Sequence, residues 1–513
     1  MILINAQENR SKKLGMFTRY VPLSIPISIG CLAAYLIEKG HQVKLWDDAI
    51  KILEDKDLVE LVKDQNRPYV FGISCLTASI FRGYELSKKI KTLFPESFVV
   101  LGGMHPTVLP DEALAKTEVD FVIREEGEIP LEQLYKAIKN NQSYDNIPNL
   151  SFKKNNQIVH NPSMKSPGID SLPPFPYHLF EKHIDKYDFG FVISSRGCPY
   201  NCIFCSQRCI TGQRFSYRSA EKVANDIELL VDKYGQKSIV FTDDNTLTDK
   251  KRIKELCQIL IHKGLNKKVA LNCQMRGDDV SENILIDLKS ANFRSLNFGL
   301  ETASERLMTL IDKKETVKQN IEALKLAQKH KFTLFGTFIL GLPTETKQDR
   351  YDCFKLAKQF LDYVRFNNAT PYPGTKLYEM AKQEKRLNVG KRWENLNACG
   401  TLIEGPFSKN RLAYVPTGTT ELELKTDVLK YNLLFSLRWK VFGRLLSRKV
   451  TTPGWFKMPK NWFLNYKEWI NLLLLGLKLF WLIISLFIAM SICSIHRLFK
   501  SSKQTKNKKT HRI

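Results

Sequence analysis

The chain has 513 residues and a formal net charge of +25, from 78 Lys and Arg against 53 Asp and Glu. Most of the excess is local, because the last 78 residues, from Ser436 onward, contain 16 Lys and Arg and one acid, Glu468. This tail is also the most apolar part of the chain, so the charge argues against nucleic acid and predicts a membrane surface as the partner. The 11 cysteines are scattered without a pairing pattern, which predicts a reducing compartment.

Residues 1–165 alternate short apolar runs with helical patterns, which predicts a doubly wound, Rossmann-like parallel sheet and an α/β fold. The expected helices cover Ile29–Glu38 and Arg82–Leu93. The expected strands are Met1–Ile4, Gln42–Trp46, Tyr69–Ile73, Phe98–Leu101 and Phe121–Ile123. Ligands of such sheets bind at the carboxyl ends of the strands.

The residues that follow three of these strands are small, polar or acidic. They are Ser74 and Thr77; then Gly102, Gly103, His105 and Pro106; and then Glu126 and Gly127. Glycines let a ligand approach the backbone closely, and hydroxyls offer hydrogen bonds. Each group alone could equally be a turn or a helix cap, but together they predict a binding edge.

A proline-rich linker, residues 166–185, precedes a second strand-helix alternation over residues 186–400. Six strands are expected there, at Phe189–Ser194, Ser238–Phe241, Val269–Leu271, Ser295–Gly299, Leu334–Leu340 and Tyr363–Asn367. Six such units predict a partial (β/α)6 barrel with its chemistry at the carboxyl ends of the strands.

Three cysteines, Cys198, Cys202 and Cys205, follow the first barrel strand at spacings of four and three residues. Three thiolates on one turn can hold three irons of a 4Fe-4S cube and leave the fourth iron open for a ligand. A structural zinc site with Cys209 as the fourth ligand is the alternative, although zinc sites usually use a second, distant pair.

This motif resembles that of the radical S-adenosylmethionine (SAM) enzymes, in which the open iron binds SAM. With the N-terminal segments, above all 102–107 and 126–128, the chain resembles the cobalamin-dependent class, which includes hopanoid methylases and the anaerobic magnesium-protoporphyrin ester cyclase. The resemblance implies that residues 1–165 bind cobalamin, through Ser74, Thr77, Gly102, Gly103, His105, Pro106, Glu126 and Gly127. An Asp-x-His-x-x-Gly motif is absent, so cobalamin would bind without a histidine from that motif.

The same resemblance implies a SAM site made of Phe204, Asp243, Gln274, Arg276, Glu301, Gly336 and Leu340. Asp243 would accept a hydrogen bond from the SAM ammonium, Arg276 would bind a carboxylate, and Glu301 would accept from a ribose hydroxyl. Gly336, Leu340 and Phe204 would pack beside adenine. Asp244 is interpreted as part of a turn, and Arg276 could instead pair with Asp278 or Asp279.

Beyond the barrel, residues 401–468 predict a basic helical region, with one helix over Leu422–Arg448. Residues 469–495 form a hydrophobic segment with a single charge, Lys478, and 496–513 a basic tail. The segment is long enough to cross a bilayer, but basic residues flank both of its ends, so a helix lying in the interface is an equal alternative. Either arrangement keeps the enzyme on the cytoplasmic side of the membrane.

These features predict a cobalamin-dependent radical SAM enzyme that methylates an unactivated carbon of a small hydrophobic or lipid substrate. The expected partners are the cytoplasmic membrane surface and an external reductant such as flavodoxin or ferredoxin, with no nucleic acid. An oxidative cyclase or rearrangement enzyme with the same cofactors, and a non-catalytic membrane-tethered sensor, are the alternatives.

Overall fold

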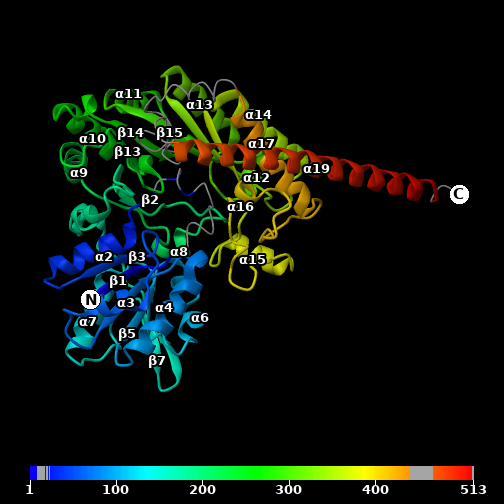
Figure 1. The fold of residues 1–513 in the computed structure, drawn as a ribbon. Coiled ribbons are helices and arrows are strands. Elements are labelled where there is room, and N and C mark those ends of the chain that lie inside the picture. Colours follow the sequence, from blue (N-terminus) through cyan, green and yellow to red (C-terminus); the bar gives the residue numbers. More distant parts are fainter. Residues whose placement is uncertain (8–17, 19–20, 22, 439–465, 511–513) are drawn as a thin grey trace.

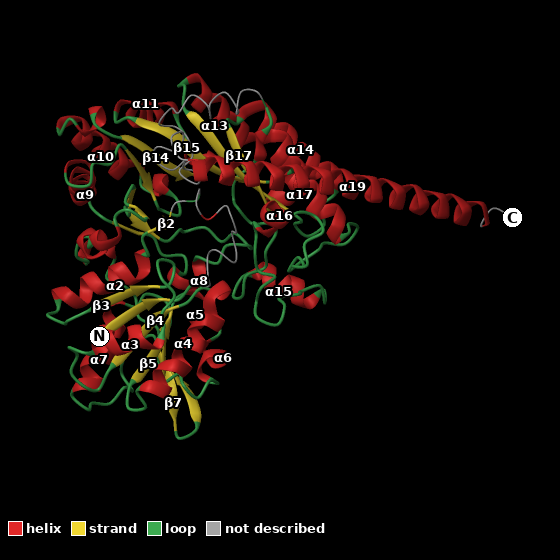
Figure 2. Ribbon diagram, in the orientation of Figure 1, coloured by secondary structure: helices red, strands yellow, loops and turns green. Residues whose placement is uncertain are grey.

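The protein is described by a computed structural model that covers residues 1–7, 18, 21, 23–438 and 466–510. Two sheets dominate these residues, one from the N-terminal part of the chain and one from its middle, and Figure 1 draws them one above the other. Helices flank both sheets, as Figure 2 shows, and a long C-terminal helix extends well beyond the rest of the fold.

The N-terminal sheet has the strand order β3-β1-β4-β5-β6-β7-β8 among the described residues. Its first five strands are parallel and its last two antiparallel. The strands are β1 (Ile2–Asn5), β3 (Lys44–Asp47), β4 (Val70–Ser74), β5 (Phe98–Gly102), β6 (Phe121–Ile123), β7 (Leu150–Lys154) and β8 (Gln157–His160).

Helices cover both faces of this sheet because its buried strands are apolar on both sides. Ile2 and Ile4 belong to one core cluster, whereas Met1 and Leu3 belong to another, as the alternation of a strand requires. The first cluster includes α3 (Asp55–Val62), α4 (Ile80–Leu93) and α6 (Pro110–Leu114), and the second α2 (Ile27–Glu38) and α7 (Glu128–Lys139). The doubly wound arrangement is therefore confirmed.

The second sheet is parallel throughout, in the order β10-β13-β14-β15-β16-β17. Its strands are β10 (Phe191–Val192), β13 (Ser238–Phe241), β14 (Ala270–Met275), β15 (Phe293–Glu301), β16 (Thr333–Leu340) and β17 (Tyr363–Asn368). The intervening helices are α9 (Ala220–Asp232), α10 (Lys250–His262), α11 (Glu282–Ser290), α12 (Glu305–Leu310), α13 (Val317–Lys329) and α14 (Lys347–Phe360).

The first barrel strand is shorter than the predicted Phe189–Ser194. It is divided into the short strands β9 (Tyr187–Asp188), β10 and β11 (Ser195–Arg196). At Gly190 a Cβ would lie 2.6 Å from the carbonyl oxygen of Ser238, so the strands approach too closely there for any side chain. β9 pairs with β2 (Leu23–Ser24), and β11 pairs with β12 (Ser216–Tyr217).

The aromatic side chains of the proline-rich linker pack between helix α2 and the barrel core. Phe175, Tyr177 and Phe180 are buried with the barrel core, and a Cβ at Gly30 of α2 would lie 2.5 Å from the Phe175 ring. Tyr187 also donates a hydrogen bond of 2.7 Å to Asp47 at the end of β3. These contacts attach the N-terminal domain to the barrel.

Helix α17 (Glu421–Ser436) covers the outer edge strand of the barrel, β17. Its Asn432 side chain accepts from the Phe366 backbone N–H at 3.1 Å and donates to the Phe366 carbonyl at 2.9 Å. The described helix carries three acids and two lysines, so the excess of basic residues in the predicted Leu422–Arg448 segment lies in the sequence after Ser436. Residues 439–448 of the predicted helix lie outside the described residues.

The last described helix, α19 (Tyr466–Thr510), contains the predicted hydrophobic segment. Its residues Trp469–His496 have a mean hydropathy of 2.5 and are long and apolar enough to cross a membrane by those criteria. Leu482 and Leu486 of α19 form a small core with Leu429 of α17. The C-terminal helix is thus attached to the barrel through α17.

The buried ion pair between α14 and α17 generates a stability prediction. Arg350 Nε donates to Asp427 Oδ2 at 2.9 Å, and both side chains are almost fully buried. Replacing Asp427→Ala leaves the guanidinium without this partner, so we expect the free energy of unfolding to fall by about 3–5 kcal/mol. Urea denaturation followed by circular dichroism measures the change.

The matched control is Asp145→Ala, which removes an exposed pair with Lys154 and should leave the urea midpoint of unfolding close to the wild-type value. Equal effects of the two substitutions would contradict the importance of the Arg350 pair.

Candidate functional site

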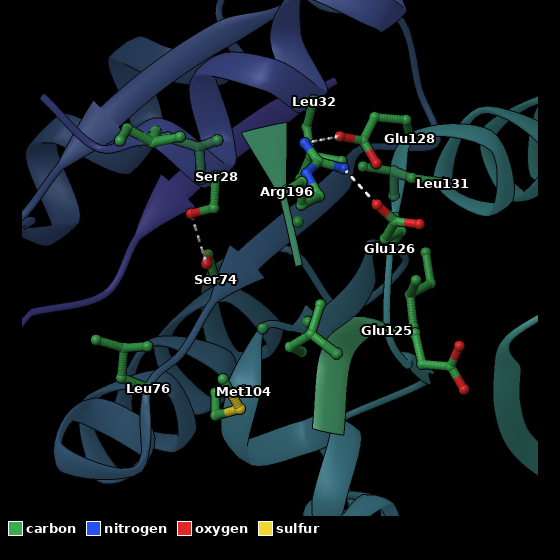
Figure 3. Close-up of a pocket in the computed structure, with 18 of the residues that line it drawn as sticks. Ser28, Leu32, Ser74, Leu76, Met104, Glu125, Glu126, Glu128, Leu131 and Arg196 are labelled. Carbon is green, nitrogen blue, oxygen red and sulfur yellow. Dashed lines mark hydrogen bonds and ion pairs between the residues drawn. The ribbon is translucent and has the colours of Figure 1, made fainter. Parts of the chain in front are cut away.

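A cavity of about 380 Å³ lies where the N-terminal sheet faces the start of the barrel. The N-terminal domain contributes the carboxyl ends of β4, β5 and β6, and the barrel side contributes β11, α8 (Arg208–Thr211) and the residues after β13. Figure 3 shows this arrangement. The carboxyl ends of both sheets therefore meet at one cavity.

The cavity has an apolar part and a polar rim. Its apolar part runs between the sheet and helices α2 and α7 and includes Leu32, Val100 and Leu131. At the rim the Ser28 and Ser74 hydroxyls lie 3.2 Å apart, as Figure 3 shows. A ligand with one apolar end and one polar end matches this lining.

Arg196 crosses the cavity from the barrel side to the N-terminal domain. One guanidinium nitrogen donates to Glu126 at 2.9 Å and another to Glu128 at 2.8 Å (Figure 3). Burial would raise the pKa of the Glu128 carboxyl, but the Arg196 charge outweighs it and holds that pKa below its usual range. Because Arg196 lies two residues before Cys198, this ion-pair cluster fixes the cysteine loop against the N-terminal domain.

The structure brings five of the eight residues predicted for cobalamin to the cavity. Ser74, Gly102, Gly103, Glu126 and Gly127 line it. At Gly103, with φ of +95°, a Cβ would lie 2.7 Å from the Cys75 carbonyl oxygen, so this turn requires glycine.

The other three, Thr77, His105 and Pro106, do not line the cavity. His105 is fully buried, 3.4 Å from Glu112 and edge-on to the Trp393 ring. Helix α5 (Met104–Val108) begins directly after Gly103, and its Met104, not His105, lines the cavity, so cobalamin contact by His105 stays a prediction.

Sequence reasoning missed several lining residues, among them Met104, Arg196 and Gln207. For Arg196, its position two residues before the first motif cysteine is the sequence signal that could have placed it at the cavity.

The three motif cysteines share one loop. The Cys205 N–H donates to the Cys202 carbonyl at 3.1 Å, which closes the turn. Burial raises the pKa of Cys202 to about 12 and of Cys205 to about 11, and neighbouring motif cysteines add to both shifts. All three thiols thus lie on one loop, and binding iron there would release their protons.

The described residues do not support a zinc site with Cys209 as its fourth ligand. The Cys209 thiol donates to the Gly374 carbonyl at 3.3 Å. No three described His, Cys, Asp or Glu side chains are placed to hold a single metal ion. The three thiols on one loop fit a multi-iron cluster, in which each binds a different iron.

The two acids after β13 lie in different surroundings. Asp243 is buried and accepts from the backbone N–H groups of Ser194 at 2.9 Å and Ser195 at 2.8 Å, so its carboxylate holds the strand that precedes the cysteines. Asp244 lines the cavity and accepts from the Gly197 N–H at 3.0 Å. Burial raises the pKa of Asp244 to about 6. The acid that can meet a ligand is therefore Asp244.

Arg276 pairs with Asp278, as the alternative interpretation allowed, in a bidentate contact at 2.9 and 2.8 Å. The pair is buried, and the guanidinium stacks 3.5 Å from the ring centroid of Tyr200. Tyr200 lies between Cys198 and Cys202, so Arg276 supports the cysteine loop. Gln274, two residues before Arg276, is exposed, and its side-chain amide donates to the Asp244 carbonyl at 3.4 Å.

Glu301 lies at the end of β15 with a left-handed φ of +59°. Its Oε1 lies 3.3 Å from the buried Lys313 ammonium, which also pairs with Glu315 at 2.8 Å. Burial opposes the charge on Lys313, but the two carboxylates hold its pKa above the usual range. This ion triad lies near Cys202, because the charge of Lys313 lowers the pKa of the Cys202 thiol and that of Glu301 raises it.

Gly336 and Leu340 face the helices rather than the barrel interior. Along β16 the residues Leu334, Gly336, Phe338 and Leu340 are buried, whereas those between them are partly exposed. A Cβ at Gly336 would lie 2.4 Å from Leu361, so glycine is needed there for packing. The contact of these two residues with adenine stays a prediction. Phe204 is partly buried against the barrel core.

The raised pKa of Asp244 generates a prediction about pH. The folded protein holds this proton more tightly than the unfolded chain, whose Asp has a pKa near 3.8. Without cofactors, the stabilisation that the wild-type protein gains from this carboxyl should therefore fall as pH rises from about 4 to about 6, by about 3 kcal/mol in total relative to Asp244→Asn. Asp244→Asn should remove this loss, which urea unfolding across that pH range measures. Parallel pH profiles for the two proteins would contradict the prediction.

Comparison with known proteins agrees with this geometry. Residues 192–357 match the family model of the radical SAM superfamily, and residues 17–135 match that of the B12 binding domain. These matched ranges contain the cysteine loop and four of the strand ends around the cavity.

Three relatives illustrate the similarity. The uncharacterised methyltransferase PH0819 of Pyrococcus horikoshii is 32% identical over 364 residues, covering 69% of this chain and 78% of that protein. The anaerobic magnesium-protoporphyrin IX monomethyl ester cyclase of Cereibacter sphaeroides is 26% identical, covering 70% of this chain and 60% of that protein. The hopanoid C-3 methylase of Methylococcus capsulatus is 24% identical, covering 72% of this chain and 71% of that protein.

The fold is also that of a solved structure, the radical SAM methyltransferase TsrM from Kitasatospora setae with cobalamin and a [4Fe-4S] cluster bound. The TM-score is 0.64 at 16% identity, covering 76% of this chain and 79% of that chain. Together with the family models and the relative from Pyrococcus, this places the chain in the cobalamin-dependent radical SAM methyltransferase family, whose members use a 4Fe-4S cluster, SAM and cobalamin.

Proposed function

We propose that this enzyme transfers a methyl group to an unactivated carbon of a hydrophobic, lipid-like substrate. The observation that carries the proposal is a cavity lined by both domains, with strand ends of the N-terminal sheet opposite the residues next to the cysteine loop. Reactants held in one cavity meet without diffusing through solvent.

In this proposal Cys198, Cys202 and Cys205 hold the 4Fe-4S cluster. Ser74, Gly102 and Gly103 would hold cobalamin, and the apolar part of the cavity between the sheet and helices α2 and α7 would accommodate its less polar portion. When bound, the cluster and SAM supply the radical that removes a hydrogen atom from the substrate, and cobalamin supplies the methyl group.

The protein's own side chains orient these groups. Asp244 accepts a hydrogen bond from the SAM ammonium, whose positive charge favours the ionised carboxylate. Gln274 and Phe204 lie beside the same ligand, and Glu301 accepts from a ribose hydroxyl. Arg196, held by Glu126 and Glu128, fixes the separation of the two cofactors, and the apolar cavity wall excludes water.

A lipid-like substrate is proposed from the C-terminal helix and from the similarity to a hopanoid methylase. The helix would hold the enzyme on the cytoplasmic side of a membrane, where such substrates are concentrated. The electron for radical formation would come from an external reductant such as flavodoxin or ferredoxin. An oxidative cyclisation with the same cofactors is the second candidate, favoured by the similarity to the protoporphyrin ester cyclase.

The product balance separates these two reactions. The enzyme is reconstituted without oxygen with iron, sulfide, cobalamin, SAM, a reductant and a membrane lipid extract. Methyl transfer predicts S-adenosylhomocysteine and 5'-deoxyadenosine in a ratio of about one, because one SAM supplies the methyl group and another the radical. Deoxyadenosine alone would reject methyl transfer and favour cyclisation.

The cysteine assignments predict different outcomes for two neighbouring substitutions. Cys205→Ala removes a proposed cluster ligand, so the iron content and the 4Fe-4S absorbance should fall to background and deoxyadenosine formation should stop. Cys209→Ala removes only a hydrogen bond to Gly374 and should keep the cluster and most of the activity. Loss of the cluster in the Cys209 variant would contradict the three-cysteine assignment and identify Cys209 as a fourth cluster ligand.

A further inference from the structure

Helix α19 has two different apolar faces. Leu475, Leu482, Leu486, Ala489 and Cys493 are buried, and their spacings of seven, four, three and four residues place them on one stripe. The rest of the helix surface exposes large apolar residues, with Leu473 65%, Phe480 59%, Trp481 67% and Phe487 61% accessible. An apolar surface of this length is not left facing water in a soluble protein, so it requires a covering partner.

The buried stripe is fixed to the soluble part of the enzyme. Leu482 and Leu486 pack on Leu429 of α17, with Leu433 and Met490 beside them. A Cβ at Gly405, directly after α16 (Gly400–Glu404), would lie 3.0 Å from the Leu482 side chain. In Figure 1, α19 runs alongside α17 and then continues past the body of the molecule. The contact therefore involves the middle of the apolar segment, not its end.

This contact is incompatible with a helix that crosses a bilayer. Leu482 is near the midpoint of Trp469–His496, so a spanning helix would place it near the centre of a hydrocarbon core about 30 Å thick. Helix α17 would have to enter with it. Its Asp427 is paired with Arg350 of the barrel, and its Asn432 bonds the edge of β17, so α17 cannot leave the polar domain without breaking these contacts.

We propose that α19 lies in the plane of an anionic membrane, with its buried stripe on α17 and its exposed face among the acyl chains. Charge favours lipid over a second protein chain as the occupant. The sequence has eight Lys and Arg from Arg438 to Lys467 and seven from Arg497 to Arg512. An in-plane helix keeps both basic flanks on one anionic leaflet, whereas a spanning helix moves one of them across.

This inference rests on the proposed membrane association and adds the orientation of the helix. In this orientation α19 holds the barrel at the membrane surface, so that a substrate dissolved in one leaflet reaches the enzyme without crossing water.

The first test uses flotation of the full-length holoenzyme with vesicles of phosphatidylglycerol and phosphatidylcholine. Phe480→Ser with Phe487→Ser should reduce the bound fraction at least tenfold. A matched control, Ile286→Ser with Tyr351→Ser, removes exposed apolar residues of the barrel helices and should not change binding. Pure phosphatidylcholine vesicles should bind at least tenfold less wild-type enzyme. Unchanged binding of the α19 variant, or equal binding to both vesicles, would overturn the proposal.

The second test locates the C-terminus in sealed membrane vesicles, by protease digestion of a C-terminal epitope tag. An in-plane helix predicts that the tag and the N-terminal domain are digested from the same side. Digestion from opposite sides would overturn the in-plane orientation while leaving membrane association intact. Failure to float with any vesicle would overturn membrane association itself, and a dimer lost in the Phe480 and Phe487 variant would then identify a second copy as the occupant.

Discussion

The site depends on the position of the backbone between Ser194 and Cys198. Two adjacent carboxylates fix that position by accepting hydrogen bonds from its N–H groups. Asp243 accepts from Ser194 and Ser195, and Asp244 accepts from Gly197. Hydrogen bonds to an ionised carboxylate are about twice as strong as neutral ones. The position of the first cysteine is therefore set by β13 as well as by its own strand. Since β10 has only two residues, it could not fix that loop alone.

The same short segment connects the two domains. Arg196 extends from it to Glu126 and Glu128, while Arg214, which follows the cysteine loop, pairs with Glu125 at 3.0 Å. Each of these acids follows β6 at the cavity edge. Buried ion pairs are geometrically demanding and contribute little net stability compared with apolar packing. Their value here is in fixing position, because they hold one cofactor-binding edge at a defined place relative to the other.

Sequence patterns predicted the two sheets and most strand ends because those depend on apolar periodicity, which each segment carries in its own residues. They failed where the direction of a single side chain mattered. Asp243 and Asp244 are adjacent in a turn, and nothing local says which one enters the cavity. Strand β16 is apolar on both sides, so alternation alone does not show that Gly336 lies on the face that packs against Leu361. The pairing of Arg196 with Glu126 joins residues 70 positions apart, and no local pattern contains such a contact.

The amide of Asn432 closes the exposed edge of the barrel. By bonding both the N–H and the carbonyl of Phe366, it occupies the position that another strand would otherwise take, and helix α17 covers the rest of β17. Exposed parallel edge strands are templates for intermolecular pairing. The helix that attaches the C-terminal segment thus also protects the barrel against aggregation. A shortened enzyme that ends before α17 would consequently become prone to self-association during expression, for a reason unrelated to lipid, whereas one that ends after Arg438 would keep its edge covered.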